Sequence, residues 1–186
     1  MDGVNVKNYK FDTLYDKLGY VTQKAVLFAG SIRENVFFGE SGAPETDEEL
    51  KNAIELSQAE EFVDKLPDGT EHMISQMGRN VSGGQKQRLS IARALSRKPE
   101  ILVFDDSFSA LDYKTDAKLR EGLNEKLKDT TKIIVAQRIS TIRHADKIIV
   151  LDRGEAVGMG THEELMKNCD VYKEIALSQL SAAELA

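Results

Sequence analysis

One pattern limits more than any other how this chain can fold. It is a glycine turn, followed one helix later by an apolar strand that ends in two acids. The turn is the Ser-Gly-Gly-Gln stretch Ser82–Gln85, and the apolar run Ile101–Phe104 ends at Asp105 and Asp106. Serine and glutamine three positions apart have the spacing of a capping box, so a helix should begin here. A continuous apolar run is typical of a strand that is buried on both faces of a parallel sheet. We therefore expect an α/β fold.

Strand and helix patterns alternate through the second half of the chain, which predicts a mostly parallel sheet. The expected strands are Leu18–Thr22, Ile101–Phe104, Lys132–Ala136 and Lys147–Leu151, with Glu155–Gly158 after a turn. The expected helices are Thr115–Leu127, Ile139–His144, Thr161–Lys167, which starts with a Thr161/Glu164 capping box, and Val171–Leu180.

Residues between Ile32 and Pro99 have the pattern of a helical insertion into that sheet. A short helix is expected at Ile32–Val36, and the helix that opens at Ser82 should continue to Ser96. Apolar residues recur at helical spacing from Thr46 to Leu66, which predicts one long helix that Pro67 ends.

Composition excludes several functional classes. The 186 residues carry a net charge of −6, whereas a nucleic-acid-binding protein usually presents a basic face. The longest uncharged apolar runs are far shorter than the roughly 20 residues of a membrane-spanning helix. The single Cys169 excludes an internal disulfide, and the three histidines lack the spacing of zinc ligands.

The glycine turn has the chemistry of an anion site. Gly83 and Gly84 let backbone N–H groups approach a ligand closely, and the helix dipole favours negative charge at this end. A phosphate fits both properties. Asp105 ends a buried strand, where side chains of α/β sheets meet ligands, and its carboxylate can hold Mg²⁺ through water.

These residues resemble the nucleotide-binding domain of an ABC transporter. Ser82–Gln85 looks like the signature motif, and Ile101–Asp106 looks like the Walker B strand. Four residues resemble the D-loop: Ser109, Ala110, Leu111 and Asp112. Gly19–Gln23 is similar to the strand that leads to the Q-loop glutamine, and Leu27–Val36 is similar to the stretch that follows it in multidrug- and lipid-exporter types.

The resemblance implies a P-loop NTPase-like (RecA-like) sheet with a helical signature subdomain. It suggests four segments: core strands and Q-loop in 1–31, the helical subdomain in 32–99, Walker B, D-loop and switch in 100–160, and C-terminal helices in 161–186.

The resemblance also implies a function. The cofactors would be ATP and Mg²⁺, with Gln23 reaching toward the metal and the attacking water. The partners would be a second ABC nucleotide-binding domain, whose ATP contacts Ser82–Gln85, and a transmembrane domain, with no nucleic acid. The parent protein would couple ATP hydrolysis to export from the cytoplasmic face of a membrane.

Two positions depart from the family pattern. Asp106 stands where the family has a catalytic glutamate, and its carboxylate is one bond shorter; misplacement by about 1 Å can cost a hundredfold in rate. Gln137 stands at the switch histidine and cannot carry a proton charge. With an intact signature, this pattern predicts the degenerate-site half of a heterodimeric exporter.

No Gly-Lys pair occurs in the sequence, so it holds no Walker A phosphate loop. We accordingly expect a fragment whose sheet is incomplete on its N-terminal side, with the Walker B strand losing an edge partner. Alone, this chain should neither hydrolyse ATP nor bind it tightly.

Two other interpretations remain. The chain could be a stand-alone, non-hydrolysing module that offers its signature to a complete ATPase. It could also belong to an ABC ATPase of DNA repair or translation, against which the exporter-like Leu27–Val36 and the acidic charge argue.

Overall fold

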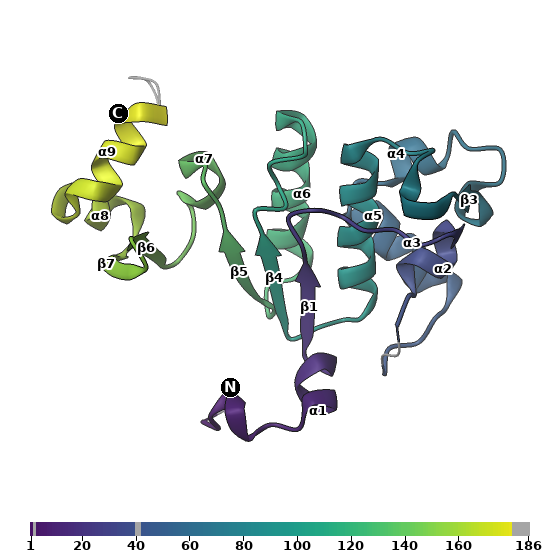
Figure 1. Cartoon of the computed structure of the whole chain (residues 1–186), viewed down its shortest axis with the longest axis horizontal. Helices are drawn as coiled ribbons and strands as arrows, with labels where there is room; N and C mark the ends of the chain where they lie inside the picture. The colour runs from purple at the N-terminus through teal and green to yellow at the C-terminus, as the bar shows by residue number, and fades with distance from the viewer. Residues whose placement is uncertain (2, 40–41, 180–186) are drawn as a thin grey trace. The chain divides into compact units, whose positions relative to one another are not determined.

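The computed structural model describes residue 1, residues 3–39 and residues 42–179, and their contacts form two compact units (Figure 1). The first unit is Met1–Val135, and the second begins at Ala136.

A parallel sheet of three strands lies at the centre of the first unit. Its strands are β1 (Leu18–Val21), β4 (Ile101–Asp105) and β5 (Thr131–Val135), in the order β1-β4-β5. The register of both pairs is parallel, with Tyr20 opposite Val103 and Val103 opposite Ile133. The expected α/β fold with a parallel sheet is confirmed, but the strand expected at Lys147–Leu151 is not part of this sheet; it pairs antiparallel with the segment that follows it.

Strand β4, which resembles a Walker B strand, is the central strand of this sheet. The expectation that it would lose an edge partner is wrong, because β4 bonds to β1 on one side and to β5 on the other (Figure 1). Among the described strands, the edges of this sheet are β1 and β5, and on β5 Ile133 and Val135 are 49% and 51% exposed. Sequence reasoning misplaced the edge because strand order is a long-range property.

The two faces of the sheet differ in burial. Val21, Leu102 and Phe104 are fully buried and share one apolar cluster with side chains of α5 (Gly83–Ser96) and α6 (Tyr113–Lys126). On the other face, Tyr20 on β1 is 56% exposed and Ile133 on β5 is 49% exposed, with Val103 of β4 between them in the register.

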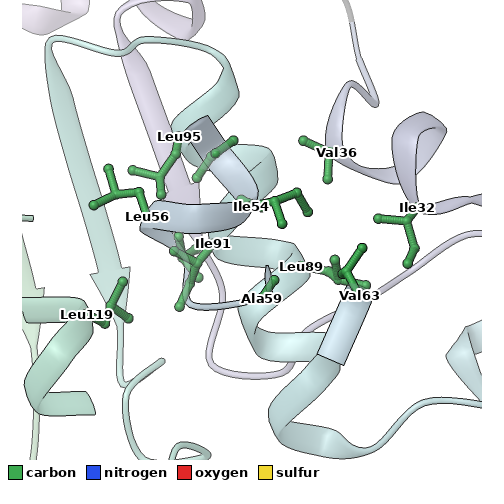
Figure 2. Packing of buried hydrophobic residues seen from close by; sticks show 14 of the residues in the cluster. Ile32, Val36, Ile54, Leu56, Ala59, Val63, Leu89, Ile91, Leu95 and Leu119 are labelled. Carbon is green, nitrogen blue, oxygen red and sulfur yellow. The ribbon is translucent and has the colours of Figure 1, made fainter. Parts of the chain in front are cut away.

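Helices α2 (Ile32–Val36) and α3 (Asp47–Leu56) pack against α5 to form the helical subdomain. Figure 2 shows apolar side chains of these helices, among them Ile54 and Leu89, packed together with Val63 from the segment between α3 and α5. The predicted bounds of α2 are confirmed, and α5 matches the predicted signature helix.

The single helix expected from Thr46 to Leu66 is wrong, because the chain breaks between α3 and α4 (Glu60–Val63). Gln58 takes a left-handed φ of 60°. Its N–H bonds to the carbonyl of Glu55, while the N–H of Ala59 bonds to the carbonyl of Ile54, which together make a Schellman helix end. Apolar residues beyond the break face the same core. The helical spacing of apolar residues in the sequence therefore continues across the break and does not reveal it.

Smaller elements complete the first unit. They are η1 (Val6–Asn8), α1 (Phe11–Asp16), β2 (Gly30–Ser31), η2 (Gly69–Glu71), β3 (Met73–Ile74) and η3 (Gln76–Gly78). Strands β2 and β3 pair antiparallel.

The second unit has its own apolar core, around Ile148, Leu165 and Tyr172. It contains α7 (Ile139–Ile142), β6 (Ile148–Asp152), β7 (Glu155–Gly160), α8 (His162–Asn168) and α9 (Asp170–Gln179). Strand β6 pairs antiparallel with β7 across a turn at Arg153 and Gly154, both with positive φ. The Thr161/Glu164 capping box is confirmed, whereas Leu180 lies outside the described residues.

Candidate functional site

The Ser-Gly-Gly-Gln turn forms the start of α5 as its sequence predicts. The Ser82 Oγ accepts a hydrogen bond from the Gln85 N–H at 3.3 Å, and the Gln85 Oε1 accepts one from the Ser82 N–H at 2.8 Å. This reciprocal pair fixes where the helix begins.

This helix start is accessible. Ser82 and Gly83 are exposed, and a Cβ placed on Gly83 would meet no atom within 4 Å. A Cβ on Gly84 would lie 3.5 Å from the Ala110 carbonyl oxygen, so the signature-like turn and the D-loop-like segment are neighbours. Free N–H groups at an open helix start can bind a phosphate.

Two side chains on α5 that follow the glycine turn connect the helix to other segments. The buried Gln87 donates from Nε2 to the Thr22 carbonyl at 3.1 Å, just beyond β1. Arg88 donates from Nη1 to the Gln58 carbonyl at 2.8 Å. The helix that carries the turn is therefore tied both to the sheet and to the break after α3.

The two acids at the end of β4 each accept a hydrogen bond from the β1 segment. The Tyr20 Oη donates to Asp105 Oδ2 at 2.9 Å, and the Gln23 Nε2 donates to Asp106 Oδ2 at 3.0 Å. The structure thus brings together three of the predicted site residues: Gln23, Asp105 and Asp106. The bond to the Asp105 carboxylate raises the pKa of Tyr20, which keeps the phenol a donor.

Asp106 has an uncommon backbone conformation, with a φ of 43°. Its N–H still continues the sheet by bonding to the Val135 carbonyl at 2.9 Å. Aspartate enters this left-handed region more readily than most residues. The turn then leads directly into the D-loop-like segment.

Hydrogen bonds also fold the D-loop-like residues. The Ser109 Oγ donates to the Asp106 carbonyl at 2.7 Å, and Leu111 is buried. Asp112 caps α6 by accepting from the Thr115 hydroxyl and N–H, and these bonds lower the pKa of Asp112. Asp112 is thus a helix cap as well as part of the motif.

Gln137 belongs to the second unit, directly after its first residue Ala136. Its backbone carbonyl accepts a hydrogen bond from the Gln179 Nε2 at 2.8 Å. The contacts described for the acids of β4 lie within the first unit.

The donor set at the end of β4 suits Mg²⁺ accompanied by phosphate. Within residues 1, 3–39 and 42–179, no cluster of three or more His, Cys, Asp or Glu side chains could cage a metal. Mg²⁺ usually takes one or two protein carboxylates and completes its shell with water and substrate phosphates. Asp105, the predicted metal-holding residue, can supply one such carboxylate.

An exposed aromatic pair follows the Q-loop-like residue. Phe28 and Phe38 stack with ring centroids 4.1 Å apart, and the Arg93 guanidinium lies 5.5 Å from each ring. Arg93 also donates to the backbone carbonyls of Asn35 and Val26, which fixes its position on α5.

The helices in the described part of the chain include none that is long and apolar enough to cross a bilayer.

Comparison with known proteins identifies the family. Residues 1–109 match the family described as ABC transporter. A putative ABC transporter ATP-binding protein of Mycoplasma genitalium is 44% identical over 183 residues, covering 93% of this chain and 29% of that protein. Multidrug resistance protein 1 of Entamoeba histolytica is 43% identical over 186 residues, covering 100% of this chain and 14% of that protein.

A solved structure of a bacterial Atm1-family ABC exporter with ATP bound has a TM-score of 0.89 and 34% identity; the match covers 95% of this chain and 31% of that one. The chain belongs to the ABC transporter family, and it is homologous to the ATP-binding domains of exporters, with their P-loop NTPase fold. It spans less than a third of the length of the relatives named here.

Proposed function

We propose that this chain is part of an ATP-binding subunit of an ABC exporter, which couples ATP binding and hydrolysis to export across a membrane. Its partners are a second nucleotide-binding domain and a transmembrane domain, and it works at the cytoplasmic face. Similarity to an exporter with bound ATP supports this role. The exposed Phe28 and Phe38 pair offers an apolar surface suited to a transmembrane partner.

The observation that carries the proposal is the start of α5, which is exposed and is fixed by two reciprocal hydrogen bonds. The side chains of Ser82 and Gln85 cap the helix by accepting from each other's backbone N–H groups. The N–H groups of the two glycines between them are left for a ligand that binds at the helix start. The space at Gly83 admits a bulky anion. In this proposal, that anion is the terminal phosphate of ATP seated on the partner domain.

In contrast, the acids at the end of β4 belong to the ATP site on this chain itself. Asp105 would hold Mg²⁺ through water, and the metal supplies positive charge that offsets the phosphates. Asp106 and Gln137 replace the glutamate and histidine of the family pattern, so water is oriented and deprotonated less effectively. We infer slow turnover at this site and competent turnover at the partner's site, as in one half of a heterodimer.

The test is Gly83→Glu in the full-length protein assembled with its partner. A carboxylate at this position repels phosphate, so ATPase activity should fall by about a hundredfold or more. Acidic side chains in a first helical turn stabilise the helix by about 0.3–1 kcal/mol, so the melting temperature should not fall.

Gly42→Glu is the matched control, because it makes the same substitution at an exposed glycine outside the turn, where a Cβ also meets no atom within 4 Å. It should retain ATPase activity within about twofold. If Gly83→Glu also retained full activity, the turn would be a capped helix start without a phosphate-binding role.

A further inference from the structure

Tyr20 reaches the metal-facing carboxylate from the neighbouring strand. Tyr20 pairs with Val103, and Asp105 lies two residues farther along β4 on the same face of the sheet. Such diagonal neighbours are about 7–8 Å apart at their Cα atoms, a gap that a long aromatic side chain can span. The resulting bond from Tyr20 Oη to Asp105 Oδ2 measures 2.9 Å.

This bond limits how the Asp105 carboxylate can turn. The last torsion of an aspartate is broad, because rotation about an sp³–sp² bond meets no sharp barrier. A donor held at Oδ2 fixes the plane of the carboxylate. A carboxylate has about four acceptor positions, so it can keep this bond while also accepting from metal-bound water.

The donor is also neutral, unlike a lysine or arginine at the same place. A cationic partner would compete with Mg²⁺ for the negative charge of Asp105, whereas a phenol leaves that charge in place. Tyr20 sits on β1, so the sheet register positions it; Gln23, which bonds to Asp106, lies beyond the end of the strand.

We propose that Tyr20 is a positioning residue that orients the Asp105 carboxylate toward Mg²⁺, a role that rests on the function proposed above. Tyr20 acts through Asp105 and does not itself touch the metal or the nucleotide. Its removal should therefore weaken metal binding without changing the fold.

The experiment measures Mn²⁺ binding by electron paramagnetic resonance in the full-length protein with ATP. Tyr20→Phe should weaken Mn²⁺ affinity by about three- to tenfold, the loss expected for one hydrogen bond to a charged group in a partly exposed place. The control is Tyr15→Phe, since Tyr15 is 57% exposed on α1 and stacks on Phe11 through its ring. That control should leave both Mn²⁺ affinity and melting temperature unchanged.

A double-substitution cycle distinguishes positioning from a general structural role. In the Asp105→Ala background, Tyr20→Phe should cause no further loss of the remaining Mn²⁺ affinity. An equal loss in both backgrounds, or unchanged affinity in Tyr20→Phe alone, would overturn the inference while leaving the proposed function intact. If the unsubstituted protein failed to bind Mn²⁺ with ATP, the proposed function would fail and the inference with it.

Discussion

The start of α5 and the end of β4 are the two halves of the candidate site, and the chain builds them in different ways. At Ser82–Gln85, both fixing bonds join residues three positions apart. At Asp105 and Asp106, the bonds reach residues 85 and 83 positions away. The helix start is therefore organised by local sequence, whereas the strand end depends on the register of the sheet.

The two halves should therefore respond differently to substitution. A substitution in the glycine turn can change binding while the fold stays intact. A substitution that shifts β1 against β4 should disturb stability and site geometry together. Three substitutions test that contrast, beyond the changes at Gly83 and Tyr20.

The largest effect is expected at the strand end from Asp106→Glu. The longer side chain should restore the reach of a catalytic base and raise turnover at the chain's own site by about ten- to hundredfold. Glutamate tolerates the φ of 43° less well than aspartate, so stability should fall by about 1 kcal/mol or less.

Single-turnover hydrolysis in the full-length protein, assembled with the proposed partner domain, measures this gain, with Asp12→Glu on the exposed start of α1 as control. Unchanged turnover at the site that contains Asp106 would count against a degenerate role for this residue.

The next effect comes from the sheet register, through Gly19→Ala on β1. A Cβ on Gly19 would lie 2.8 Å from Leu102 Cδ2 and 2.9 Å from the Ala94 carbonyl oxygen, so the strand must move. We expect a loss of about 1–3 kcal/mol in the free energy of unfolding, measured by urea denaturation.

Gly83→Ala on the helix start is the matched control and should change that free energy by about 0.5 kcal/mol or less. If both substitutions lowered the free energy of unfolding equally, the helix start and the strand end would not differ in their dependence on long-range contacts.

The smallest effect is expected from Ser82→Ala, which removes the side chain of one helix cap. The free energy of unfolding should fall by about 1 kcal/mol, seen as a small decrease in melting temperature. Ser82→Asp keeps an acceptor at the cap and should retain the stability of the unsubstituted protein. A loss as large as that of Gly19→Ala would mean that the helix start also has a long-range structural role.

The features predicted from the sequence are mostly local ones. Capping boxes at Ser82 and Thr161 depend on residues three positions apart, and both were found. The parallel pairing of β4 and β5 followed from the alternation of strand and helix patterns. The expected burial on both faces did not hold, because Ile133 and Val135 are 49% and 51% exposed.

The missed features depend on contacts that spacing does not reveal. The left-handed Gln58 interrupts a helix whose apolar pattern continues across the break. The bond between Tyr20 and Asp105 follows from strand register, which the isolated segments do not specify. The central position of β4 likewise depends on strand order.

Helix α5 carries the Ser82–Gln85 turn at its start and Arg93, beneath the Phe28 and Phe38 rings, in its last turns. An α-helix rises about 1.5 Å per residue, so these two places are about 16 Å apart on one stiff rod. The rings and the glycine turn thus lie at opposite ends of one helix. The spacing between the aromatic surface and the proposed phosphate site is therefore kept nearly constant whenever this helix moves as a unit.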